Sequence, residues 1–180
     1  MAILENDLIR LRAPELSDLD LLYKWENNEE VWPISNTLTP FSRELLKKYL
    51  NNAHEDIFQA RQLRLMIDVR KDNDLAVETI GAIDLFNFEP HHLRAGVGIL
   101  IGDNEQRGKG YAGQALGILI DYAFKVLGLH QLYCNVFTNN ETSLNLFKSK
   151  GFKIIAEKKD WIKLGDKWQN EYLMQLIWNS

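Results

Sequence analysis

The feature that most restricts the fold of this chain is a long amphipathic helix between two apolar strands. Residues 93–101 and 131–137 are rich in Val, Ile and Leu, which is typical of strands. Between them, residues 111–127 carry apolar side chains at helical spacing. Two strands joined through a helix pair in parallel, because a hairpin turn cannot return the chain to the same end of the sheet. The centre of the fold is therefore predicted to be a parallel βαβ unit.

The segments on both sides of this unit predict hairpins and further helices. A strand is expected at residues 8–12, then a helix over 18–28 with Ser17 as its N-cap, then a helix after Pro40. The second of these helices is expected to bury Leu45, Leu46, Tyr49 and Leu50. Antiparallel strands are predicted at 62–69, 79–87, 152–164 and 168–178, and a helix at 141–150. The class is then α/β to α+β with a mixed sheet, and residues 1–180 are expected to form a single domain.

Composition and charge exclude several classes of protein. The chain of 180 residues has 21 Lys and Arg against 25 Asp and Glu, and its net charge of −4 is unsuited to binding nucleic-acid phosphates. No apolar run approaches the ~20 residues that cross a bilayer, and the first residues lack a secretory apolar segment. The single cysteine, Cys134, can form neither an intrachain disulfide nor a Cys-rich zinc site. We expect a cytoplasmic enzyme or small-ligand binder with no membrane and no nucleic-acid partner.

A loop rich in glycine and cations, residues 106–113, precedes the central helix. Glycines let the backbone turn tightly, and N–H groups at the start of a helix form an anion site, to which Arg107 and Lys109 add positive charge. A plain structural turn is the alternative. The three glycines also satisfy the dinucleotide pattern G-x-G-x-x-G, although no acidic residue ends the next strand to hold a ribose. A nucleotide-hydrolase phosphate loop fits poorly, because Gly110 stands where Ser or Thr would bind magnesium.

Two motifs in the same chain resemble the GNAT family of N-acetyltransferases. Residues 107–112 match the R-x-x-G-x-A loop that binds the pyrophosphate of coenzyme A in that family, and residues 140–152 resemble its N-x-x-S/A…G-F helix. One helix and one strand separate the motifs, as in the family. Residues 8–19 are similar to the branch with spermidine and ribosomal-protein N-terminal acetyltransferases. The resemblance implies a mixed, mostly antiparallel sheet with a splayed central parallel strand pair, flanked by helices.

The resemblance also implies acetyl-CoA as the co-substrate, without a metal. In the family, the loop amides hold the pyrophosphate, the preceding strand offers main-chain groups to the pantetheine, and the last helix lines the same cleft. Carried over residue by residue, the co-substrate positions are Ile99, Leu100, Ile101, Arg107, Gly108, Lys109, Gly110, Tyr111, Ala112, Asn140, Ser143 and Phe147. Asn140 also suits a helix N-cap, which is a purely structural role.

The proton donor for the departing thiolate differs from the common family pattern. Many relatives carry a Tyr where this chain has Phe147, which has no exchangeable proton. Relatives that act on ribosomal-protein N-termini also lack this Tyr, and there the Ser of the helix motif is the proposed donor. Ser143 is therefore the first candidate and Tyr133 the second, with backbone bonding and strand packing as their structural alternatives. A thiol with a pKa of about 8.5 is a fairly good leaving group, so water could also suffice.

Several residues are candidates for the general base, because Gly96 stands where many relatives of the family carry a Glu. Asp84 and Glu89 could act through water, and His91 and His92 lie in the following turn. Histidine titrates near neutrality and suits base chemistry. A solvated side chain is the alternative for each of these residues.

The N-terminal helices carry an excess of acidic residues, which could steer a cationic amine toward the cleft, although a solvated helix face explains such charge as well. A polyamine, a protein N-terminus and an aminoglycoside all fit as acceptors. We expect an N-acetyltransferase that works by direct attack of a primary amine in a ternary complex. Cys134 lies in an apolar strand without an activating base, so covalent catalysis is not expected. A non-catalytic acetyl-CoA-binding module and a nicotinamide-dependent oxidoreductase are the alternatives, and the resemblance implies that the chain can form a homodimer.

Overall fold

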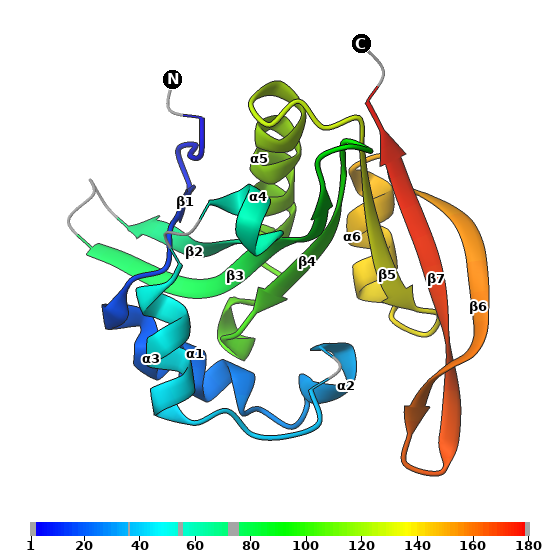
Figure 1. Ribbon diagram of the computed structural model, residues 1–180, viewed down its shortest axis with the longest axis horizontal. Coiled ribbons are helices and arrows are strands. Elements are labelled where there is room, and N and C mark those ends of the chain that lie inside the picture. The colour runs from blue at the N-terminus through cyan, green and yellow to red at the C-terminus, as the bar shows by residue number, and fades with distance from the viewer. Residues whose placement is uncertain (1–2, 36, 54–55, 72–75, 179–180) are drawn as a thin grey trace. The chain divides into compact units, whose positions relative to one another are not determined.

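The fold is organised around a seven-stranded sheet in the residues that the computed structural model describes, 3–35, 37–53, 56–71 and 76–178 (Figure 1). The strands are β1 (Ile9–Arg12), β2 (Leu63–Lys71), β3 (Ala76–Glu89), β4 (Arg94–Ile101), β5 (Gln131–Phe137), β6 (Lys153–Leu164) and β7 (Lys167–Ile177). Their order in the sheet is β1-β2-β3-β4-β5-β7-β6. β4 and β5 pair in parallel, and the other neighbours pair antiparallel. This mixed sheet confirms the predicted fold class.

The helices belong to two compact units of the chain. The unit that contains the sheet also contains α4 (Ile57–Ala60), η2 (Asn104–Gln106), α5 (Tyr111–Lys125) and α6 (Glu141–Ser149). The other unit, Ala13–Asp56, contains η1 (Leu16–Asp18), α1 (Leu19–Glu26), α2 (Trp32–Ser35) and α3 (Arg43–Asn51).

The core of the sheet unit lies on the face of the sheet that α5 and α6 cover. Side chains alternate between the two faces of a strand, so residues two apart on β4 and β5 enter the same core. Its fully buried members include Ala95, Val97, Leu116, Leu119, Leu132, Cys134, Val136, Leu144 and Phe147. The intervening residues Gly96, Gly98 and Tyr133 therefore lie on the opposite face of the sheet. That division decides which side chains surround the candidate site.

The smaller unit departs from the sequence prediction at the start of its first helix. The backbone N–H of Glu15 donates to the Asp18 carboxylate at 2.8 Å, and a 3-10 turn leads into α1 at Leu19. Ser17 is thus inside the turn and is not the N-cap that we predicted. Glu15 is the N-cap of the turn and forms a capping box with the buried Asp18, and Asp18 is the N-cap of α1 without a side-chain cap bond.

The second helix of this unit, α3, begins where the sequence suggested. The Ser42 hydroxyl accepts from the Leu45 N–H at 3.1 Å, which caps the helix. Leu46 and Leu50 are buried as predicted, whereas Leu45 is 51% exposed. The prediction was wrong for Leu45 because Leu46 and Leu50, four residues apart, define the buried side of α3, and Leu45 lies about 100° around the helix from Leu46.

Candidate active site

The parallel strands β4 and β5 part from one another shortly after they begin. Their paired residues are Arg94 with Gln131, Ala95 with Leu132 and Gly96 with Tyr133, and among the described residues no later pair joins the two strands. β4 stays paired with β3 as far as Ile101. The stretch from Val97 to Ile101 therefore has one main-chain edge turned toward the diverging β5 (Figure 1). Unpaired strand edges offer N–H and C=O groups to a ligand.

The glycine-rich loop lies between the end of β4 and the start of α5. Gly108 and Gly110 have φ values of 76° and 85°, and a Cβ atom at either position would meet nothing within 4 Å. Glycine is thus required by backbone conformation and not by lack of space. The first turn of α5 begins at Tyr111, and the Gln114 N–H bonds to the Gly110 carbonyl. The backbone N–H groups of α5 before Gln114 have no carbonyl partner within the helix, so they can form an anion-binding site.

Two cations hold this loop in place. The Arg107 Nε donates to the carbonyl of Ile101 at 3.0 Å, which ties the loop to the last residue of β4. The Lys109 Nζ lies 2.9 Å from Gln106 Oε1, and Gln106 in turn donates to Glu78 of β3 at 3.1 Å. Both side chains thus brace the loop while adding positive charge to it. The sequence predicted their charge, but the tether between Arg107 and Ile101 was missed because no local pattern encodes it.

The start of α6 carries the two residues of the second motif. Asn140 Oδ1 accepts from the Ser143 backbone N–H at 3.1 Å, so Asn140 is the N-cap of this helix. The half-buried Ser143 hydroxyl makes no hydrogen bond among the described residues. Asn140 therefore has the structural role that we considered as its alternative, and the Ser143 hydroxyl is available to a ligand.

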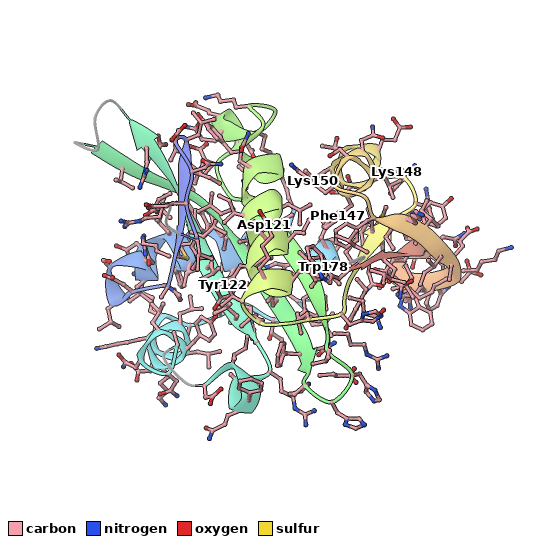
Figure 2. All side chains as sticks on the ribbon, turned by 90° about the horizontal axis from the view of Figure 1, so that it is seen from above. Asp121, Tyr122, Phe147, Lys148, Lys150 and Trp178 are labelled. Carbon is pink, nitrogen blue, oxygen red and sulfur yellow. The ribbon has the colours of Figure 1, made fainter. Side chains whose placement is uncertain are left out.

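Phe147 lies in the core behind α6. Its side chain is 4% exposed and packs edge-to-face on Phe152 with ring centroids 5.1 Å apart. Figure 2 shows it on the inner side of α6, whereas the neighbouring Lys148 lies on the outer side. Phe147 thus stabilises the packing of α6 on the sheet, and its contact with a co-substrate stays a prediction.

An aromatic corner stands where β4 and β5 part, on the face of the sheet opposite the core. We define it as Phe86, Gly96, Gly98 and Tyr133. A Cβ atom on Gly96 would lie 2.4 Å from Phe86 Cε2, so the Phe86 ring occupies the space of any side chain at position 96. The Phe86 and Tyr133 rings meet at 5.9 Å and 81°. The Tyr133 hydroxyl lies 3.5 Å from Asn87 Nδ2.

The candidate bases on β3 are already engaged with arginines. Glu89 receives hydrogen bonds of 3.0 to 3.1 Å from Arg94. Asp84 receives bonds of 2.7 and 3.2 Å from Arg64. The exposed rings of His91 and His92 meet edge-to-face with centroids 4.9 Å apart. The structure therefore brings Tyr133 to the strand junction and holds Glu89 and the histidines at the β3–β4 turn.

Cys134 has no access to a substrate. It is 1% exposed in the core, and burial raises the pKa of its thiol well above the ordinary range. The thiol stays protonated at neutral pH, and a protonated thiol is not a nucleophile. No group of three or more His, Cys, Asp or Glu side chains suited to a metal ion occurs in the described part of the chain. None of the described helices is long and apolar enough to span a bilayer.

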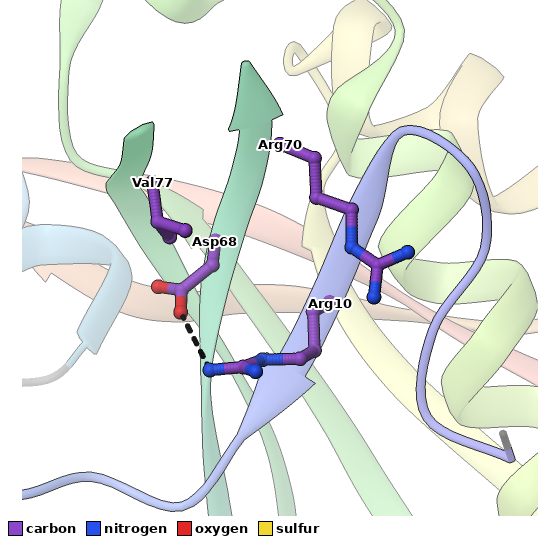
Figure 3. Close-up of a pocket in the computed structure, with 4 residues that line it drawn as sticks. All are labelled: Arg10, Asp68, Arg70 and Val77. Atoms are coloured by element: carbon purple, nitrogen blue, oxygen red, sulfur yellow. Dashed lines mark ion pairs between the residues drawn. The ribbon is translucent and has the colours of Figure 1, made fainter. Parts of the chain in front are cut away.

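A separate hollow of about 230 Å³ lies near β1 and β2, lined by Arg10, Asp68, Arg70 and Val77 (Figure 3). The buried Asp68 carboxylate receives hydrogen bonds of 2.7 Å from Arg12 Nε and from the Thr79 hydroxyl. Arg10 lies 3.8 Å from the same carboxylate. These contacts join β1, β2 and β3, which indicates a structural role for the cluster.

Comparisons of the sequence and of the structure with known proteins all find N-acetyltransferases. The model of the acetyltransferase (GNAT) domain matches residues 9–153. The spermidine N(1)-acetyltransferase of Vibrio cholerae is 27% identical over 150 residues, which cover 82% of this chain and 80% of that protein. An uncharacterized N-acetyltransferase, p20 of Bacillus licheniformis, is 28% identical over 177 residues, covering 98% and 97%. The structure of a Vibrio cholerae spermidine N-acetyltransferase in complex with CoA and spermine superposes with a TM-score of 0.83 at 24% identity, covering 96% of each chain.

Proposed function

The chain belongs to the GNAT acetyltransferase domain family, and from that membership we propose that it moves the acetyl group of acetyl-CoA to a primary amine by direct attack in a ternary complex. The family match includes residues of both compact units. We therefore propose that residues 1–180 act as one catalytic domain. The observation that carries the proposal is the open loop of left-handed glycines beside the diverging strands.

The residues of the loop fit the pyrophosphate of acetyl-CoA. Backbone N–H groups from Arg107 to Ala112 surround the start of α5, and the helix dipole favours a negative group there. The main chain of Ile99, Leu100 and Ile101 runs along the unpaired edge of β4 and suits the amides of the pantetheine arm. Asn140 and Ser143 would face the same arm from α6.

The reaction needs one new bond and one broken bond. The unprotonated amine nitrogen attacks the thioester carbonyl carbon, the carbon–sulfur bond breaks, and the nitrogen loses one proton while the thiolate gains one. We assign the proton donated to sulfur to the Ser143 hydroxyl, because Ser143 is half-buried and its hydroxyl is free of hydrogen bonds among the described residues. Tyr133 is the second candidate. Glu89 is a candidate for the opposite role, the base that takes the proton from the nitrogen through water, and it is a weak one because Arg94 occupies its carboxylate.

A polyamine is the acceptor that we propose. The support is the likeness to spermidine N-acetyltransferases of Vibrio cholerae and Escherichia coli. In the smaller unit, Asp18 bonds within its own turn and Asp20 pairs with Arg43, whereas Glu29 and Glu30 are exposed. Their charge suits a cationic acceptor.

The test is release of free CoA thiol from acetyl-CoA in the presence of spermidine, spermine, peptides that begin with Ala or Ser, and an aminoglycoside. We expect turnover with the polyamines above all. If acetyl-CoA raises the melting temperature but no amine releases thiol, the chain is a non-catalytic binding module. Binding of NAD without binding of acetyl-CoA would overturn the proposal altogether.

A further inference from the structure

The geometry points to Phe86 as the side chain that limits the length of the acyl group, so that this chain accepts acetyl-CoA and rejects longer acyl-CoA thioesters. The inference rests on the proposed function, because it names the acyl specificity of the same site. It comes from the contact between Phe86 and the two glycines of β4, which no step of the acetyl transfer described above uses.

Phe86 and the two glycines of β4 form an interlocking contact. The Phe86 ring carbons Cε2, Cζ and Cδ2 lie 2.4, 2.5 and 2.8 Å from the position that a Cβ of Gly96 would take. At Gly98 the corresponding distances to Cε1 and Cδ1 of the ring are 3.7 and 3.9 Å. The ring therefore lies directly on the backbone of β4 and extends from one glycine to the next. It cannot move closer to the strand, because no space is left at Gly96.

The corner is placed at the end of the path that an acyl-CoA arm would follow. From Ile101, next to the loop, to Gly96 there are five residues of β-strand, which span about 17 Å. A pantetheine arm has roughly the length of four to five extended residues, on the order of 15 Å. An arm that begins at the loop and follows the unpaired edge of β4 thus brings its thioester to the region of Gly98 and Gly96.

We place the acyl group on the face of the sheet that lies opposite the core. On the face covered by α5 and α6, Ala95, Val97 and Leu132 are fully buried in the core. On the other face, the β4 glycines carry no side chains, and the half-buried Phe86 and Tyr133 rings lie beside the strand at 81° to one another. An acyl chain that extends beyond the thioester on this face meets the Phe86 ring.

The chemistry of the contact favours a short chain. A methyl group adds little volume, but each added methylene has to displace a ring that the strand blocks on one side and Tyr133 on another. One methylene in a hydrophobic pocket changes selectivity by about 10- to 200-fold. We therefore expect acetyl-CoA to be preferred over propionyl-CoA, and propionyl-CoA over butyryl-CoA.

The experiment compares these three thioesters in the wild type, Phe86→Ala, Phe86→Leu and a control, Phe58→Ala. Phe58 is an aromatic residue that packs edge-to-face on Phe88 of β3. Turnover with spermidine gives the ratio of kcat/KM for propionyl-CoA to that for acetyl-CoA. Calorimetric binding of the same thioesters gives a second readout that needs no acceptor. Phe86→Ala should raise both ratios about tenfold or more, and Phe58→Ala should leave both unchanged.

Ratios that stay at the wild-type value in folded Phe86→Ala would overturn the inference. If that variant fails to fold, Phe86→Leu carries the test, because leucine keeps an apolar contact with Gly96 but is shorter than the ring. An equal change in Phe58→Ala would also overturn it, since the effect would then not be local. A wild type that binds the thioesters but acetylates no amine contradicts the proposed function alone, and the binding ratios still decide the role of Phe86.

Discussion

At the scale of single residues, the candidate active site differs from the expected family pattern at two positions, Gly96 and Phe147. The resemblance to the family led us to expect a base where this chain has Gly96, and the Phe86 ring fills the space that a side chain would take there. It also led us to expect a proton donor where the chain has Phe147, which packs in the core. Packing thus accounts for both residues.

The contact between Gly96 and Phe86 leads to a prediction about stability. Gly96→Ala should destabilise the protein by about 1–3 kcal/mol, because the added methyl group collides with the ring and the strand must shift. Gly98→Ala is the matched control, since its Cβ would meet the same ring at an ordinary 3.7 Å. Urea unfolding of both variants measures the difference. Equal stability of the two would contradict the interlocking contact, and Phe86→Leu should rescue Gly96→Ala.

The proton-donor assignment is tested at Ser143. Ser143→Ala should lower kcat by about tenfold or more, because a general acid is lost, while the affinity for acetyl-CoA changes little. Ser149→Ala, on the same helix, is the control, because the Ser149 hydroxyl donates to the Leu146 carbonyl at 2.6 Å. Steady-state kinetics and calorimetry give the two quantities. An unchanged kcat in Ser143→Ala would remove this residue as the donor and leave Tyr133 or water.

At the scale of elements, the predicted bounds of helices and strands match the structure where a periodic apolar pattern extends over several helical turns or along a whole strand. The start of α5 at Tyr111 and the whole of β5 match the prediction. The four-residue helices α2 and α4 were missed, because so short a segment shows no periodicity. β3 begins at Ala76 and not at residue 79, because pairing with β2 extends the strand beyond its apolar part. Half of the hairpin loop that we predict over residues 71–78, namely residues 72–75, lies outside the described residues.

The junction of the loop with α5 supports a prediction about co-substrate binding. Gly110→Val should weaken acetyl-CoA binding at least about tenfold, or ~1.4 kcal/mol, because a left-handed backbone with a branched side chain cannot hold the N–H groups in place. Gly165→Val is the matched control, since Gly165 also has a positive φ and open space but lies in the β6–β7 turn. Calorimetry measures both affinities. Equal affinities would contradict the assignment of the pyrophosphate loop.

At the scale of the whole molecule, stability is linked to pH through the core. Cys134 is buried, and burial raises its thiol pKa in the folded state. The unfolded thiol ionises near pH 8.5. Above that pH the unfolded chain binds fewer protons than the folded one, so this group's contribution to stability is full below pH 8.5 and is lost as the pH rises.

This linkage can be measured by unfolding at several pH values. Between pH 8.5 and 10 the cysteine should remove about 2 kcal/mol from the free energy of unfolding. Cys134→Ala is the control, because it lacks the titrating group while other residues titrate as before. The wild type should lose more stability than the variant over this interval. Parallel losses would show that the thiol is not shielded in the folded protein.

The sequence by itself determined the order of the strands and of the longer helices, the position of the glycine-rich loop and the resemblance to the family, because these depend on residue spacing within one or two adjoining elements. Only the tertiary structure decided that β4 and β5 part after Gly96 and Tyr133, and that Phe86 covers Gly96. It also decided that arginines occupy Asp84 and Glu89. The pairing between β4 and β5 joins segments about 37 residues apart, across a helix. Strand register and packing determine which side chains meet in such long-range contacts, and a pattern within one segment of the sequence does not contain that information.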